Sequence, residues 1–123
     1  GSAVLDVALL AATAGGDLER MRKYAFLFLD TTRENLAGID TALAGGDLTH
    51  TASLAHQLKS AARAVGATAF AAICEDLEAQ PVRELRGGGT AQARALTARL
   101  RALLVRIERE VSAQFGSRAS DGR

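Results

Sequence analysis

Apolar residues recur at steps of three and four along most of the chain, which is the spacing of one face of an α-helix. The longest of these stripes predicts one extended amphipathic helix over residues 17–43, and another predicts the last helix, ending near Phe115. The first stripe comprises Leu18, Met21, Ala25, Phe28, Thr32, Leu36, Ile39 and Leu43. The second comprises Leu96, Leu100, Leu103, Ile107, Val111 and Phe115.

Helix breakers divide the remaining sequence into shorter segments. The tetrapeptide Gly-Gly-Asp-Leu occurs twice, at 15–18 and at 45–48. In each copy a glycine can end one helix in the left-handed conformation, and the aspartate can cap the next helix. A third break lies at Gly66-Ala67-Thr68, and Gly87-Gly88-Gly89 predicts a flexible link with a cap at Thr90. These breaks predict helices at 48–65 and 69–79, and a short leading helix at 4–14.

Four main helices with short connections pack most simply as an antiparallel up-down-up-down four-helix bundle, with the short leading helix capping one end. Composition agrees, because alanine and leucine dominate the apolar residues, only 4% of residues are aromatic, and there is no tryptophan. Alanine and leucine favour helices, whereas strands need β-branched and aromatic residues. We therefore predict an all-α domain over residues 3–115 and a disordered polar tail over 116–123.

Charge and cysteine content exclude several classes of function. Fifteen Lys and Arg against fourteen Asp and Glu give a net charge of +1, with the two signs interspersed. A nucleic-acid partner is therefore not expected, since it would require a clustered excess of basic residues. The sequence has no apolar run long enough to span a membrane. A single cysteine, Cys74, cannot form an intramolecular disulfide and fits a cytoplasmic protein with a small thiol in its core.

The helix predicted at 48–65 presents a histidine on its polar side. At about 100° per residue, His56 lies about 160° from the centre of the apolar face. That face comprises Leu54, Ala55, Leu58, Ala61, Ala62 and Val65. The residues one turn before and after the histidine are Ala52 and Ser60, and Ala64 follows one turn later. Small side chains leave an imidazole accessible to a second macromolecule, so we expect Ala52, Ser60, Arg63 and Ala64 to contact a partner.

Two cations lie close to this histidine along the helix. Lys59, three residues on, can place its ammonium group beside the imidazole, and Arg63 adds a second cation one turn further. A nucleophilic ring next to cations suits an anionic group such as phosphoryl. The other histidine, His50, lies in the first turn of the helix and is expected to be an ordinary surface residue.

A family resemblance rests on the same segment. Ala55-His56-Gln57-Leu58-Lys59-Ser60, followed by Val65-Gly66-Ala67, resembles the A-H-x-L-K-G…G-A signature of histidine-containing phosphotransfer (HPt) domains. The resemblance covers about residues 5–115, and Ser60 stands where the family usually has glycine. It implies that His56 accepts a phosphoryl group on Nε2 and that Lys59 stabilises that group.

The resemblance also implies a role for Glu78, which follows His56 by 78 − 56 = 22 residues. Some family members place a polar residue there that hydrogen-bonds to the histidine Nδ1. A carboxylate that accepts from Nδ1–H would fix the tautomer and leave the Nε2 lone pair free to attack. Glu75 points further outward on the same predicted helix and is the weaker candidate.

By this resemblance the chain is a phosphocarrier of a two-component phosphorelay, which moves a phosphoryl group on His56 between aspartates of receiver domains. The partners it implies are response-regulator receiver domains and a sensor or hybrid histidine kinase, with neither nucleic acid nor membrane involved. No metal site or cofactor is expected, and any Mg²⁺ would be bound by the partner receiver domain. Whether the chain is itself an enzyme stays open, because it has a nucleophilic histidine but no ATP-binding or autokinase motif.

Two alternatives remain. The chain could be the HPt module of a larger histidine kinase, phosphorylated directly by an ATP-binding domain. It could instead be a helical adaptor that is never phosphorylated, in which His56 has no role. A second question concerns Tyr24, Phe26 and Leu27, which lie off the main stripe of their helix. The leading helix could cover them, or part of this patch could dock a partner.

Overall fold

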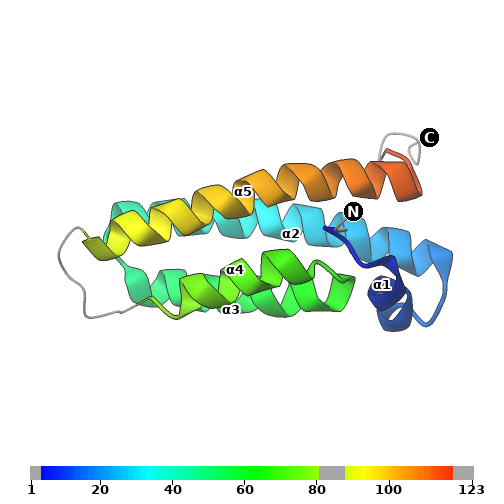
Figure 1. The fold of residues 1–123 in the computed structure, drawn as a ribbon, viewed down its shortest axis with the longest axis horizontal. Coiled ribbons are helices and arrows are strands. Elements are labelled where there is room, and N and C mark those ends of the chain that lie inside the picture. Colours follow the sequence, from blue (N-terminus) through cyan, green and yellow to red (C-terminus); the bar gives the residue numbers. More distant parts are fainter. Residues whose placement is uncertain (1–3, 81–87, 118–123) are drawn as a thin grey trace.

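The computed structural model describes residues 4–80 and 88–117, and every regular element in that part of the chain is a helix (Figure 1). The helices are α1 (Val7–Thr13), α2 (Leu18–Ala44), α3 (Leu48–Val65), α4 (Thr68–Glu78) and α5 (Gly88–Phe115). The all-α prediction is confirmed. Gly87, the first residue of the predicted link, and most of the predicted polar tail lie outside the described residues.

The four long helices form a bundle in which each runs opposite to the one before it (Figure 1). α3 packs against α2 and α4, and α5 closes the bundle by packing against the same two helices. The short helix α1 lies across one end, where it contacts α2 and α3. This arrangement leaves the outer face of α3 uncovered between its two neighbours.

The repeated Gly-Gly-Asp-Leu segments act as the helix boundaries that the sequence predicts. Gly16 and Gly46 adopt left-handed φ values of +79° and +71°. The following aspartates begin the next helices, because Asp17 accepts hydrogen bonds from the backbone N–H groups of Glu19 and Arg20, and Asp47 accepts one from that of His50. These caps satisfy N–H groups that the first helical turn leaves without partners.

The predicted start of the last helix is wrong. α5 begins at Gly88, so Gly88 and Gly89 are helical and Thr90 is not a cap. Glycine in a helix costs about 1 kcal/mol relative to alanine. The long buried face of α5 outweighs this cost, and the helix therefore extends backward through residues that favour a break.

The core confirms most of the predicted apolar faces. On α3, every predicted core residue is buried except Ala61, which is half-buried. On α2 the stripe is buried from Met21 to Leu43, but Leu18, the first residue of the helix, is 73% exposed. On α5, Leu104 is buried where the stripe predicts Leu103, which is half-buried in a groove between α4 and α5. Both leucines fit a helical spacing, and the buried face of α5 takes in Leu104 rather than Leu103.

The residues that lie off the main stripe of α2 have different environments. Phe26 is buried, and the guanidinium carbon of Arg22 lies 4.7 Å from the centre of its ring. Tyr24 packs half-buried against the core, whereas Leu27 remains 55% exposed. Of the two possibilities for these residues, cover by the leading helix does not apply to Leu27. Cys74 is fully buried, as predicted, and burial raises the pKa of its thiol to about 12.

The N-terminal segment and α1 are attached to the end of α3 by hydrogen bonds to its backbone carbonyl groups. The Asp6 N–H donates to the Gly66 carbonyl oxygen at 2.8 Å, and the Thr13 hydroxyl donates to the Ala64 carbonyl oxygen at 2.5 Å. Gly66 has a φ of +83° and lies so close to Asp6 that a Cβ atom at position 66 would overlap the Asp6 carbonyl oxygen. Glycine is thus required here for its conformation and for its lack of a side chain.

We expect Gly66→Ala to destabilise the protein more than Gly46→Ala, its matched control. Both substitutions force alanine into the left-handed region, at a cost of about 1–2 kcal/mol, but only position 66 also meets the backbone of Asp6. Gly66→Ala should lose about 1–3 kcal/mol more, the usual range for overpacking. Urea denaturation measures both free energies of unfolding. Equal losses would show that the contact between Asp6 and Gly66 is unimportant.

Candidate functional site

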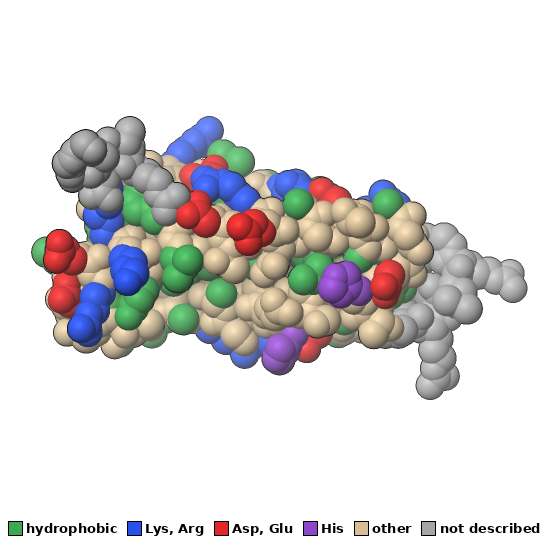
Figure 2. All heavy atoms as spheres, turned by 180° about the vertical axis from the view of Figure 1, so that it is seen from behind, with side chains coloured by type: hydrophobic (Ala, Val, Ile, Leu, Met, Phe, Trp, Pro, Cys, Tyr) green, Lys and Arg blue, Asp and Glu red, His purple; other side chains and the backbone are tan. Residues whose placement is uncertain are grey.

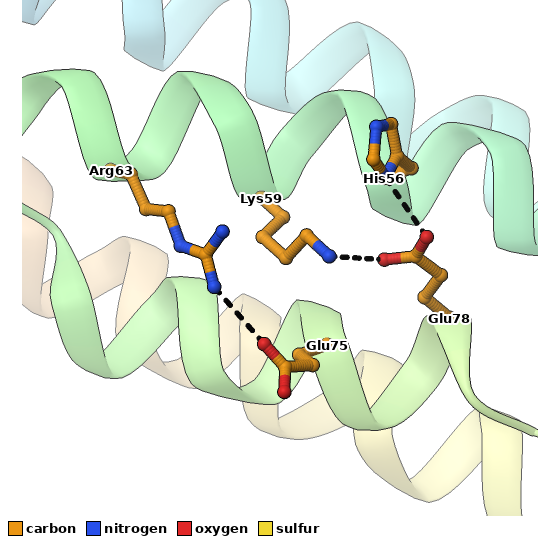
Figure 3. A network of polar contacts seen from close by, with 5 residues as sticks. All are labelled: His56, Lys59, Arg63, Glu75 and Glu78. Carbon is orange, nitrogen blue, oxygen red and sulfur yellow. Dashed lines mark hydrogen bonds and ion pairs between the residues drawn. The ribbon is translucent and has the colours of Figure 1, made fainter.

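His56 stands on the outer face of α3, at the side where α4 runs alongside (Figure 3). Its side chain is 59% exposed, in agreement with the helical spacing. Viewed from the side opposite to Figure 1, both histidines appear at the surface, each with an acidic side chain close by (Figure 2). His50 is exposed as expected. The imidazole of His56 is therefore open to a macromolecule that approaches α3.

The last residue of α4 reaches the imidazole. Glu78 Oε2 lies 2.9 Å from His56 Nδ1 (Figure 3). The two residues are equally far from Ala67 in the turn between the helices, since 67 − 56 = 11 and 78 − 67 = 11. Two antiparallel helices that pack closely bring such positions side by side. The turn at Gly66-Ala67 thus sets the register that places this carboxylate beside this ring.

The other oxygen of the same carboxylate binds the lysine. Lys59 Nζ donates to Glu78 Oε1 at 2.7 Å, and the Lys59 side chain is only 14% exposed. This hydrogen bond is the main reason that the pKa of Glu78 is lowered, with a smaller contribution from His56. Glu78 is therefore ionised at neutral pH and binds the side chains of both His56 and Lys59.

The protonation state of the carboxylate fixes the tautomer of the neutral ring. An ionised carboxylate offers only lone pairs, so the short contact requires His56 Nδ1 to be the donor. In a neutral imidazole with its proton on Nδ1, the second nitrogen, Nε2, keeps its lone pair. The arrangement thus combines an exposed ring with a free nucleophilic nitrogen and a cation held within one helical turn.

Arg63 forms a separate pair one turn further along α3. Its guanidinium donates to Glu75 Oε1 at 3.0 Å, and both side chains are more than half exposed. Glu75 is therefore the partner of Arg63, while Glu78 is the partner of His56. The structure brings together three of the predicted residues, His56, Lys59 and Glu78, and leaves Arg63 outside that group.

The small residues predicted around the histidine lie on its face of α3. Ala52 is half-buried, and Ser60 and Ala64 are exposed. On the N-terminal side of the ring the surface forms a shallow hollow, which is lined by Thr49, Ala52, Ser53, His56, Gln57 and Glu78. Of these, Thr49, Ser53 and Gln57 are absent from the sequence-based set of site residues. Helical spacing could have indicated the first two, since they precede His56 by seven and three residues.

Two further observations apply to the described part of the chain. It contains no group of three or more metal-ligating side chains that could hold a metal ion. None of its helices combines the length and apolar character needed to cross a membrane.

Comparisons with known proteins identify the family. The sequence model of a family described as "Hpt domain" matches residues 23–110. This chain belongs to the Hpt domain family. Its structure is similar to the HPT domain of the Hpt sensor hybrid histidine kinase from Shewanella, with a TM-score of 0.64 and 19% sequence identity over 93% of this chain and 97% of that one. No curated protein matches the sequence.

Membership in the Hpt family indicates the general reaction in which a histidine of this chain takes part. Hpt domains carry out histidine phosphotransfer in two-component phosphorelays, and the solved structure with the same fold is itself an HPT domain.

We expect the Glu78 carboxylate to stabilise this Hpt domain in a pH-dependent way. The folded-state pKa of Glu78 is lowered from its ordinary value of 4.5. Its stabilising contribution is therefore fully present above about pH 4.5 and is lost as the pH falls through the lower folded-state pKa. Glu78→Gln should destabilise the protein at pH 7, and the difference from wild type should shrink at pH 3.

Urea denaturation at the two pH values measures this effect. Glu75→Gln is the matched control, because it removes a carboxylate from the same helix that pairs with an exposed arginine. A Glu78→Gln deficit that is the same at pH 3 and pH 7 would contradict a stabilising ion pair.

Proposed function

We propose that this Hpt domain is a phosphocarrier that accepts a phosphoryl group on His56 from the aspartyl phosphate of one receiver domain and passes it to the aspartate of another. The observation that carries the proposal is the contact between Glu78 and His56 Nδ1, which leaves the exposed Nε2 with its lone pair. In the first step Nε2 attacks phosphorus, the bond between phosphorus and the aspartyl oxygen breaks, and the aspartate leaves as a carboxylate. The proton stays on Nδ1, shared with Glu78.

Lys59 is proposed to stabilise the transferred phosphoryl group. Its ammonium and the imidazole bind the two oxygens of the same carboxylate, Glu78, so a change of rotamer would direct the ammonium toward an anion on Nε2. A charge-assisted hydrogen bond to a phosphoryl oxygen would then offset negative charge during transfer. Mg²⁺ would be supplied by the acidic pocket of the receiver, and no cofactor is assigned to this chain.

Ala52, Ser60, Arg63 and Ala64 are proposed to form the surface that receives the partner. They share the outer face of α3 with His56, and the three small side chains let a receiver approach the ring. The exposed Leu27 on α2 offers a further apolar contact for such a partner. Docking of this kind is transient and of modest area. A sensor or hybrid histidine kinase upstream and a cytoplasmic location complete the proposal.

A second candidate assigns the same chemistry to a module of a larger histidine kinase. It is favoured by the similar HPT domain from Shewanella, which comes from a hybrid histidine kinase. In that case an ATP-binding domain would phosphorylate His56 directly. The identity of the donor that labels His56 distinguishes the two candidates.

We expect a phosphorylated receiver domain to transfer labelled phosphoryl to the wild-type protein and not to His56→Gln. His50→Gln is the matched control, because His50 is the other histidine of the chain and lies on the same helix. Its labelling should equal that of wild type. Gel autoradiography after incubation with the radiolabelled receiver measures both. Equal labelling of His56→Gln and wild type would contradict the assignment, and a wild-type protein that takes up no label would favour the adaptor alternative.

We expect Lys59→Gln to slow transfer without abolishing it. Loss of a hydrogen bond to a charged group costs about 1.5–3 kcal/mol, and solvent around the site reduces this, so the rate should fall about tenfold. Lys59→Arg should restore part of the rate because it keeps the charge. Lys23→Gln removes the other lysine, which is exposed on α2, and should have no effect. Rapid-quench kinetics measure the rates, and an unchanged Lys59→Gln rate would remove Lys59 from the mechanism.

A further inference from the structure

The carboxylate of Glu78 contacts the nitrogen that is not phosphorylated. Its Oε2 lies 2.9 Å from His56 Nδ1, on the opposite side of the ring from the exposed Nε2. Glutamine at this position could accept the same hydrogen bond, because its amide oxygen also has lone pairs. Orientation of the ring alone therefore does not require the negative charge, which binds Lys59 and also lies in contact with the imidazole.

The protonation state of Nδ1 determines which form of the ring is the leaving group when a phosphoryl group is transferred from Nε2. In that step the bond between phosphorus and Nε2 breaks, and its electron pair returns to Nε2. The phosphoryl group goes to the carboxylate oxygen of an aspartate, or to water to give inorganic phosphate. If Nδ1 holds a proton, the ring leaves as neutral imidazole. If Nδ1 has lost that proton, the ring must leave as imidazolate, which is a far poorer leaving group.

We propose that the negative charge of Glu78 keeps Nδ1 of phosphorylated His56 protonated and so makes the phosphoryl group easy to transfer onward. This inference rests on the proposed function. Glu78 is in this account a positioning residue, because it touches the imidazole and not the phosphoryl group. A carboxylate beside the ring favours the cationic, protonated form of the phosphohistidine through charge attraction and a charge-assisted hydrogen bond.

The other charged groups near the ring are paired with one another or lie further away, so Glu78 has the strongest effect on Nδ1. From α3 comes Lys59, whose ammonium is held on the second oxygen of Glu78. Arg63 on α3 and Glu75 on α4 neutralise each other one turn away. α2 packs on the buried side of α3, and its own buried residues carry no charge. Glu78 is therefore the anion in direct contact with the ring among the described residues.

Lys59 links the effect to the phosphorylation state. Before phosphorylation the ammonium group of Lys59 partly neutralises the charge of Glu78. The attraction between that carboxylate and the ring is therefore weaker. A phosphoryl group on Nε2 offers Lys59 a second anion within reach. When the ammonium turns toward that group, the full charge of Glu78 acts on Nδ1 at the stage when the proton is needed there.

The test compares phosphorylated wild type with Glu78→Gln, in a His50→Gln background so that His56 is the one histidine present. Both proteins are phosphorylated with phosphoramidate, and phosphohistidine is followed by ³¹P NMR between pH 5 and pH 10. The chemical shift reports the titration of Nδ1, and the loss of signal reports the rate of hydrolysis. Addition of an unphosphorylated receiver domain gives the rate of transfer at each pH.

The pKa of Nδ1 in the phosphorylated protein should be about one unit lower in Glu78→Gln, the lower end of the shift that a neighbouring opposite charge produces. At pH 5 both rings are protonated and should transfer at similar rates. Above both pKa values the variant should transfer and hydrolyse about tenfold more slowly. Glu75→Gln is the control and should follow wild type throughout. Glu78→Ala should lose the orienting hydrogen bond as well and be slower than Glu78→Gln even at pH 5.

Different failures have different meanings. If wild type and Glu78→Gln are both phosphorylated on His56 but show the same titration and the same rates, the inference is overturned while the proposed function stands. If Glu78→Gln is slower by the same factor at every pH, the carboxylate acts through orientation and the inference is again overturned. If the wild-type protein takes up no phosphoryl group on His56, the proposed function itself is overturned.

Discussion

The hydrogen bond between the Glu78 carboxylate and His56 Nδ1 is the interaction on which the rest of this site depends. It joins two helices, fixes the tautomer of an exposed ring, and holds the ammonium group of Lys59 through its second oxygen. An exposed histidine without such a partner would rotate freely and distribute its proton between both nitrogens. One carboxylate therefore orients a surface imidazole and fixes which of its two nitrogens keeps the lone pair.

The fold supports this contact through backbone geometry far from the ring. α3 and α4 pack closely around Gly66 and Ala67, and the left-handed Gly66 both ends α3 and receives the N-terminal segment at Asp6. Position 66 has no room for a side chain, so glycine is required in the turn that sets the register between the two helices. That register carries through eleven residues on each side to His56 and Glu78. The short helix α1 thus helps to set the geometry of a site that it does not touch.

Local periodicity was enough to predict the helices and the exposure of His56, since both follow from the position of each residue along its own helix. Contacts between helices were harder to predict. The resemblance to HPt domains implied the approach of Glu78 to His56, but the shared carboxylate that binds Lys59 depends on side-chain rotamers across two helices. The pairing of Arg63 with Glu75 has the same origin. The burial of Leu18 and Leu103 and the cap at Thr90 were predicted wrongly. In each case the local pattern allowed more than one outcome, and the position of a neighbouring element or the length of the helix decided which one formed.

The central claim is that His56 keeps its proton on Nδ1 and its lone pair on Nε2. Long-range ¹H–¹⁵N NMR of the imidazole in the unphosphorylated protein, recorded at a pH where the ring is neutral, tests it most directly. The account predicts a protonated Nδ1 and an unprotonated Nε2 for His56, with Glu78→Ala shifting the proton toward Nε2. A wild-type ring that carries its proton on Nε2 would contradict it.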